Sequence, residues 1–176
     1  MLGRVVKVNN KLQQDYTYKL TRSEGDLSDL ISFRPDLSPI QMIEYGIGGG
    51  ILFSDTIYDI EYPKEIRNII FDNSQPGNNA PYDKTLNYFG VRIPVSNNSL
   101  DKSEIIGDDP RGWIEWYLRT WMGRRTEYDK IQVQRWKDMR DDAIRLKNSC
   151  QVNDPSCKPI LRQTLLEWSY DTINKW

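Results

Sequence analysis

The segment DDPRGWIEWYLRTWMGRR, residues 108–125, concentrates the side chains best suited to binding chemistry: three of the six tryptophans and four arginines. Aromatic rings stack on unpaired bases and guanidinium groups bind phosphates, so an exposed surface of this composition would suit single-stranded or flipped-out nucleotides. The same residues would also form an aromatic core helix with basic ends, because a buried tryptophan needs only one partner for its N–H group. The sequence leaves both interpretations open.

If the surface is exposed, we expect six arginines to contact phosphates or another anion and two tryptophans to stack on bases. These candidate binding residues are Arg111, Arg119, Arg124, Arg125, Arg135, Arg140, Trp116 and Trp121. Arg135 and Asp142 fall on the apolar arc of one predicted helix but two turns apart, so each either meets a partner elsewhere or lines a cavity. Asp142 and Tyr117 are the candidate catalytic residues of such a cavity.

The chain contains no histidine. Histidine-dependent triads, Cys–His pairs and histidine-ligated metal sites are therefore excluded, and any catalysis must rest on other side chains. Cys150 and Cys157 are too few for a four-thiolate zinc site and too far apart for a C-x-x-C redox motif, so we predict no metal and no cofactor. In a reducing cytosol we expect two thiols in a turn between helices, with a disulfide as the alternative.

Capping signals position the aromatic segment on a helix. Asp109 as N-cap, Pro110 at the first helical position and Gly123 just past the end predict about thirteen helical residues. Glu115 and Arg119 are spaced for an ion pair across one helical turn. One face of this helix would carry Trp113, Trp116, Tyr117, Thr120 and Trp121, and the opposite face Arg111, Glu115 and Arg119.

Two further helices are predicted after it. One runs from Glu127 to about Asn148, with Gln132, Arg135 and Asp142 interrupting its apolar face. That face contains Tyr128, Ile131, Trp136, Met139, Ala143 and Leu146. The other runs from Ile160 to about Ile173, after a turn where Asp154 and Pro155 restart the chain, and buries Leu161, Leu165 and Trp168. Together the last three helices would form an antiparallel layer.

The N-terminal part contains shorter elements. Residues 4–22 alternate apolar and polar side chains around Asn9-Asn10, which predicts a short hairpin or a pair of edge strands. Ser38, Pro39 and Gln41 have the spacing of a capping box for a helix that stops at Gly46. The following GIGGGILF, residues 46–53, is typical of a helix end and a tight turn, with a phosphate-binding loop as the alternative. Polar loops are expected at 72–84 and 94–103.

Composition places the chain among ordinary globular proteins. Its 176 residues are 38% hydrophobic and 28% charged, with a mean hydropathy of −0.68. We predict a single domain, 1–176, mainly α with a small β component. Residues 1–107 would form a loop-rich acidic part with short strands and one helix, and residues 108–176 a basic three-helix part. Residues 1–109 carry 11 basic and 16 acidic side chains, whereas residues 110–176 carry 13 and 9.

No run is long and apolar enough for a membrane span, and the start MLGRVVKVNN lacks the apolar region of a secretory signal. We therefore expect an intracellular protein of the cytoplasm or nucleus, or one carried on a virion assembled there, without a membrane partner.

The segment at 108–125 resembles a family of uncharacterised proteins encoded by bacteria, some eukaryotes and large DNA viruses. The motif D-P-R-G-W-x-x-W-Y-x-R-x-x-x-G-R-R, the RWK at 135–137, the paired cysteines and the closing LRQTLLEWSYD carry the resemblance, which spans most of residues 108–171. It implies kinship but no activity. Family members have a cysteine at the position of Leu118 and a phenylalanine at that of Ile114.

Three hypotheses follow. The first is a nucleic-acid-associated protein that recognises unpaired or damaged bases of DNA or RNA, a class that includes enzymes working without histidine. The second is a small-molecule enzyme or a module for an anionic small molecule, with Arg135, Asp142 and Tyr117 in its pocket. The third is a structural or interaction protein, such as a minor virion component. Exposed rings at Trp116 and Trp121 would favour binding to bases, and buried rings beside a polar cleft would favour a small-molecule pocket.

Overall fold

A computed structural model describes residues 2–53, 61–73, 81–93 and 105–176. Those residues are mainly α-helical with one small antiparallel sheet, as predicted. In chain order the elements are β1 (Val5–Val8), β2 (Tyr16–Lys19), α1 (Pro39–Tyr45), α2 (Lys64–Asn73), α3 (Trp113–Trp121), α4 (Asp129–Asp138), α5 (Arg140–Ser149) and α6 (Pro159–Leu166), with 3-10 turns at Gly48–Gly50 and Lys84–Leu86. The polar loop predicted at 94–103, and residues 74–80 of the one predicted at 72–84, lie outside the described residues.

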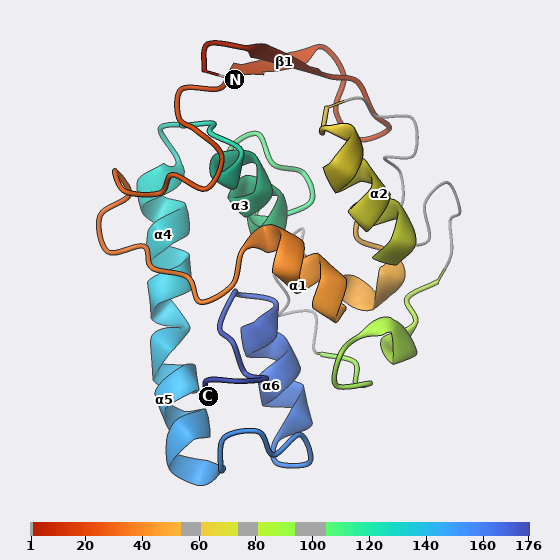
Figure 1. The fold of residues 1–176 in the computed structure, drawn as a ribbon, viewed down its shortest axis with the longest axis vertical. Coiled ribbons are helices and arrows are strands. Elements are labelled where there is room, and N and C mark those ends of the chain that lie inside the picture. Colours follow the sequence, from red (N-terminus) through yellow and green to blue (C-terminus); the bar gives the residue numbers. More distant parts are fainter. Residues whose placement is uncertain (1, 54–60, 74–80, 94–104) are drawn as a thin grey trace.

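Figure 1 shows the hairpin across one end of the molecule, α4 and α5 along one side, and α2 on the opposite side. Among the described segments, none of the helices has the length and apolar character that crossing a bilayer requires.

The predicted N-terminal hairpin is confirmed. Val5 pairs with Lys19 and Val8 with Tyr16 in antiparallel register. Asn10 Oδ1 accepts the main-chain N–H of two residues in the connecting loop, at 3.0 and 2.9 Å, which stabilises the turn. Alternation places Val6, Val8 and Tyr18 in the core, since successive side chains of a strand point to opposite faces.

The capping box of α1 is also confirmed. Ser38 Oγ accepts the N–H of Gln41 at 3.2 Å, and Gln41 Oε1 accepts the N–H of Ser38 at 2.9 Å. The helix ends at Gly46, where φ is 105°, a conformation that favours glycine. The next glycines form the 3-10 turn at Gly48–Gly50, in line with the tight turn that was predicted.

The start of α3 differs from the prediction. The helix begins at Trp113 after an N-cap at Gly112, and Asp109 does not cap it. Residues 109–112 form a turn instead, with the N–H of Gly112 donating to Asp109 O at 3.0 Å. The carboxylate of Asp109 is drawn to two arginines, because a buried charge gains more from a guanidinium partner than from a main-chain N–H. The end of the helix is as predicted, with Gly123 directly after the C-cap.

Both faces of α3 are buried. Trp113, Trp116 and Tyr117 surround Phe33, with ring centroids 6.3, 5.5 and 5.3 Å from that ring. The opposite, charged face is buried as well, since Glu115 and Arg119 are completely covered. The core interpretation of the aromatic helix is therefore confirmed for most of its length.

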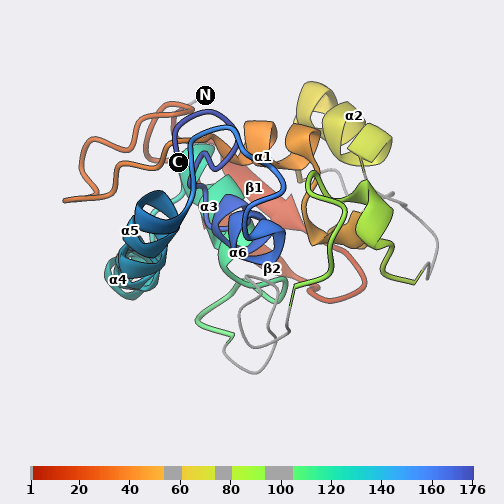
Figure 2. The same ribbon diagram turned by 90° about the horizontal axis from the view of Figure 1, so that it is seen from below.

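The single helix predicted from Glu127 to Asn148 is divided into α4 and α5 at Met139. The carbonyl oxygen of Trp136 accepts the hydroxyl of Tyr170 at 2.8 Å. It also accepts the N–H of Met139, three residues later, at 3.2 Å, which is the spacing of a 3-10 turn and not of an α-helix. The direction scarcely changes, since α4 and α5 follow one another in Figure 1 and overlap end-on in Figure 2. Ile131, predicted to be buried, is exposed, whereas Gln132 is covered.

The connection between α5 and α6 contains a disulfide. Cys150 and Cys157 are bonded, with Cα atoms 5.9 Å apart, so the expectation of two thiols was wrong. Helix α6 begins at Pro159 and ends at Leu166, earlier than predicted. Ser169 then takes a left-handed conformation with φ of 68°, and its carbonyl oxygen accepts the N–H groups of residues 36 and 37. In Figure 1 α5 and α6 run antiparallel.

Candidate functional site

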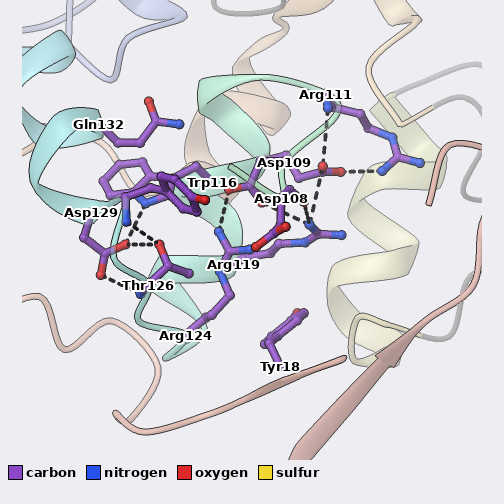
Figure 3. A network of polar contacts seen from close by, with 12 residues as sticks. Tyr18, Asp108, Asp109, Arg111, Trp116, Arg119, Arg124, Thr126, Asp129 and Gln132 are labelled. Carbon is purple, nitrogen blue, oxygen red and sulfur yellow. Dashed lines mark hydrogen bonds and ion pairs between the residues drawn. The ribbon is translucent and has the colours of Figure 1, made fainter. Parts of the chain in front are cut away.

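Arg119 lies at the centre of a buried charge network (Figure 3). Its Nε and Nη2 donate to the two oxygens of Glu61 at 2.6 and 3.1 Å, and its Nη1 donates to Asp109 Oδ1 at 3.0 Å. The guanidinium also donates to the carbonyl oxygen of Asp108 and to Gln13 Oε1, both at 2.9 Å. Each nitrogen of the group thus has an acceptor within the protein.

Two further arginines complete this network. Arg124 Nη2 donates to Asp109 Oδ2 at 2.7 Å, and its Nη1 donates to the hydroxyl of Tyr16 at 3.2 Å. Arg111 forms an ion pair with Glu115, which also lies 3.6 Å from Arg119 as the helical spacing predicted. Three guanidinium groups therefore face three carboxylates, so the charges compensate one another within the described residues.

The protonation states of the network suit a structural cross-link. Burial lowers the pKa of Arg119, but Glu115, Tyr62 and Glu61 more than offset this and hold it well above its usual range. Burial and the nearby Glu61 raise the pKa of Tyr18, whose hydroxyl donates to Glu61 Oε1 at 2.7 Å. Arg119 stays charged and Tyr18 stays protonated at neutral pH, so the network fastens the hairpin to α3.

Burial contradicts the phosphate contacts predicted for Arg111, Arg119 and Arg124, whose side chains are 4%, 0% and 0% exposed. The charge pattern of the sequence could not reveal this, because Glu61 lies 58 residues from Arg119 along the chain.

The other three predicted arginines lie apart from the network and have different surroundings. Arg125 Nη2 donates to Asp29 Oδ1 at 2.7 Å, and the side chain is 14% exposed. Arg135 lies over the ring of Trp168 at 5.4 Å and donates to Gln132 Oε1 at 3.0 Å. Arg140 is exposed on α5 and remains a predicted contact. The six arginines do not form one surface.

The two candidate stacking residues also differ. Trp116 is completely buried, and its Nε1 donates to Asp129 Oδ1 at 2.9 Å, so its predicted stacking role is contradicted. Trp121, at the end of α3, is only half-buried.

Trp121 lines a cleft of about 530 Å³, hereafter the Trp121 cleft. One wall comes from residues 25–28, a second from residues 33–38, and the third from Tyr117 and Trp121 of α3. Gly25 lies close to the indole, and its N–H donates to the carbonyl oxygen of Trp121 at 2.7 Å. Arg34 and Asp26 contribute charged groups to the cleft.

The predicted pocket of Arg135, Asp142 and Tyr117 is not assembled. Asp142 pairs with Arg145 at 2.7 Å on the exposed side of α5. Tyr117 lines the Trp121 cleft, but its hydroxyl donates to the carbonyl oxygen of Leu37 at 2.8 Å. Burial raises the pKa of Tyr117, so its hydroxyl remains a neutral donor and is unsuited to act as a base.

A second buried polar cluster surrounds Glu167, and no pattern in the sequence pointed to it. Glu167 Oε1 accepts the N–H of Gly48 at 2.9 Å, and Asn87 Oδ1 accepts the N–H of Gly49 at 2.8 Å. Gln163 Nε2 donates to the carbonyl oxygen of Gly46 at 3.1 Å. Burial raises the pKa of Glu167 to about 7. These side chains occupy the main-chain groups of the glycine segment, which supports the turn rather than a phosphate site.

In the described ranges we find no group of three or more cysteine, aspartate or glutamate side chains placed to hold a metal ion. Comparison with known proteins gave no match to a family model, to a curated sequence or to a solved structure.

Proposed function

We propose that the protein binds an unpaired nucleobase in the Trp121 cleft, presented by a single-stranded nucleic acid or by a free nucleotide. The observation that carries this proposal is the half-buried indole of Trp121 at the wall of a cleft of about 530 Å³. Ligand pockets usually occupy about 300–1,000 Å³, so the volume suits one base with its sugar. Stacking of a base on an aromatic side chain contributes on the order of 1–3 kcal/mol.

Arg34 and Asp26 would supply a donor and an acceptor for the edge of the base. Arg34 Nη1 donates to the carbonyl oxygens of Leu30 and Phe33 at 3.5 and 2.8 Å, which holds the exposed guanidinium beside the cleft. Asp26 Oδ1 accepts the hydroxyl of Ser28 at 2.6 Å, and this bond holds the pKa of Asp26 below its usual range. A guanidinium and an ionised carboxylate match the donors and acceptors along a base edge.

The charge of the cleft supports recognition of the base more than of the phosphate. Among the described residues that line the cleft, Arg34 is the one cation, and Asp26 and Asp36 are also present. For single strands, a plot of the logarithm of the affinity against the logarithm of the salt concentration has a slope of about −0.7 for each neutralised phosphate. With one arginine at the cleft we expect a slope no steeper than about −1. Six arginine contacts would instead give a slope of about −4.

Fluorescence anisotropy with labelled single-stranded DNA, single-stranded RNA and duplex DNA tests the proposal. Single strands should bind better than duplex, and Trp121→Ala should weaken binding by about 10-fold to 100-fold while Trp121→Phe retains part of it. Arg34→Ala should also weaken binding. Arg67→Ala, an exposed arginine on α2 at the opposite side of the molecule, is the matched control.

Competition by mononucleotides separates the two sources of the base. If mononucleotides displace the labelled strand as well as an unlabelled strand does at the same base concentration, a free nucleotide is a sufficient ligand. If mononucleotides compete poorly, the ligand is the single strand. If neither strands nor mononucleotides bind at low salt, the proposal is wrong.

A further inference from the structure

The loop closed by the Cys150–Cys157 disulfide holds a buried cation. Both cysteines are half-buried and most residues between them are exposed, so the bridge is within reach of a reductant. Arg162 of α6 is completely buried below this loop. Its Nε donates to the carbonyl oxygen of Cys157 and its Nη2 to that of Gln151, both at 2.9 Å.

The same guanidinium holds the segment after α6. Arg162 Nη1 donates to the carbonyl oxygens of Thr172 and Trp176 at 2.7 and 2.9 Å. The side chain of Arg162 thus relies on main-chain carbonyl oxygens from two separate segments within the described residues. A desolvated cation needs such partners, so a displacement of either segment weakens the hold on the other.

Residues 171–176, hereafter the strap, also contact the wall of the Trp121 cleft. Trp176 Nε1 donates to Asp36 Oδ2 at 2.7 Å, and the N–H of Asp171 donates to the same oxygen at 3.1 Å. Lys175 forms an ion pair with Asp36. Because Asp36 lines the cleft, the strap connects Arg162 to one wall of the candidate binding site.

We propose that the Cys150–Cys157 bridge is a redox-modification site, and that its reduction by a dithiol loosens the strap from the wall of the cleft. The effect on ligand binding rests on the proposed function, whereas the loosening does not. One thiolate of the dithiol attacks a sulfur of the protein bridge, which forms a mixed disulfide and releases the other cysteine. The second thiolate of the dithiol then attacks the reductant sulfur of the mixed disulfide and releases the remaining cysteine. Two electrons and two protons pass to Cys150 and Cys157, and the reductant leaves as a disulfide.

The backbone of the loop explains why the bridge matters. Asn153 inside the loop and Lys158 directly after it adopt left-handed conformations, with φ of 64° and 51°, which residues other than glycine rarely take. Closure by the bridge constrains these conformations. Once the bridge is open, the chain can relax at both positions, and the carbonyl oxygens of Gln151 and Cys157 move away from Arg162.

Hydrogen–deuterium exchange of the oxidised and the reduced protein tests the proposal without any ligand. After reduction with dithiothreitol, exchange should become at least about tenfold faster in the strap and at the N–H groups of residues 36 and 37, and should remain unchanged in α3. Cys150→Ser/Cys157→Ser should exchange like the reduced protein and should not respond to dithiothreitol. Val152→Ala, in the same loop, should behave like the wild type in both redox states.

If the serine variant does not fold, native reduction followed by alkylation with iodoacetamide gives the same readout on the wild-type chain. The proposal would be overturned if mass spectrometry confirms that the bridge is reduced and the exchange rate in the strap is unchanged.

Titration of a labelled single strand in both redox states separates this inference from the proposed function. Faster exchange without base binding in either state supports the redox site and refutes the binding function. Equal binding in both states despite faster exchange would overturn the link between the strap and the cleft.

Discussion

Replacing Glu167 with glutamine should remove a pH-dependent loss of stability. Glu167 is completely buried, and its Oε2 has no hydrogen-bond partner among the described residues. Burial raises its pKa to about 7, although the N–H of Gly48 and the amide of Gln163 oppose this. Ionisation therefore places a charge where the described residues supply no cation to stabilise it.

The magnitude follows from the interval between this pKa and the ordinary value of 4.5. Between those values the folded chain keeps a proton that the unfolded chain has released, so the free energy of unfolding falls as pH rises. Each pKa unit corresponds to about 1.36 kcal/mol, and the loss across the interval is therefore about 3 kcal/mol. Above about pH 7 the full penalty is present, and below about pH 4.5 it is absent.

Urea unfolding of the wild type and Glu167→Gln, from about pH 4.5 to 8.5, measures this effect. The stability of the variant relative to the wild type should rise by about 3 kcal/mol across that range. At the acidic end the variant should be equal to the wild type or about 1 kcal/mol less stable, because the amide brings an additional buried N–H. Other titrating groups cancel in the difference.

Glu44→Gln, on the exposed side of α1, controls for the removal of a carboxylate without change at the buried site. A constant difference between Glu167→Gln and the wild type at every pH would refute the reasoning.

Three further substitutions test the packing. Asp109→Asn leaves two buried arginines, Arg119 and Arg124, without their shared carboxylate. The free energy of unfolding, measured with urea, should therefore fall by about 3–5 kcal/mol. A urea midpoint equal to that of the exposed control Asp141→Asn would contradict this. Gly123→Ala should lower Tm more than Gly90→Ala. The φ angle is positive at both positions, but a Cβ at Gly123 would lie 2.1 Å from the carbonyl oxygen of Arg22, whereas a Cβ at Gly90 would have nothing within 4 Å. Ser169→Gly should raise the free energy of unfolding by about 1 kcal/mol. The change relieves a left-handed φ of 68° and removes a buried hydroxyl that has no hydrogen-bond partner among the described residues. A loss of stability in urea unfolding would contradict this expectation.

Several elements were predictable because their causes lie within a few residues. The alternation at 4–22 predicts the hairpin, the Ser38 and Gln41 pair predicts the start of α1, and Gly123 predicts the end of α3. Each depends on local side-chain periodicity or on hydrogen bonds between near neighbours. The mainly α class follows from the same local patterns, whereas the burial of the aromatic face of α3 was one of two interpretations that the sequence left open.

The candidate site was less predictable, because the surroundings of a charged group are set by residues distant in the chain. Of the two predicted stacking residues, only Trp121 lies at a cleft, since Trp116 meets Phe33 and Asp129 in the core. The walls formed by residues 25–28 and 33–38 showed no pattern typical of a binding site. The raised pKa of Glu167 arises from burial against a glycine segment 119 residues earlier.

By itself the sequence determined the hairpin, the presence of α1, α3 and α6, the absence of histidine chemistry and the separation of acidic from basic residues, whereas α2 was not predicted. The tertiary structure decided what those charges do. The excess of basic residues in 110–176 suggested an anion-binding surface, but Glu61 and Asp29 of the acidic part reach Arg119 and Arg125. A buried guanidinium is stable only beside such partners, so the folded chain uses several of these charges to join its two parts.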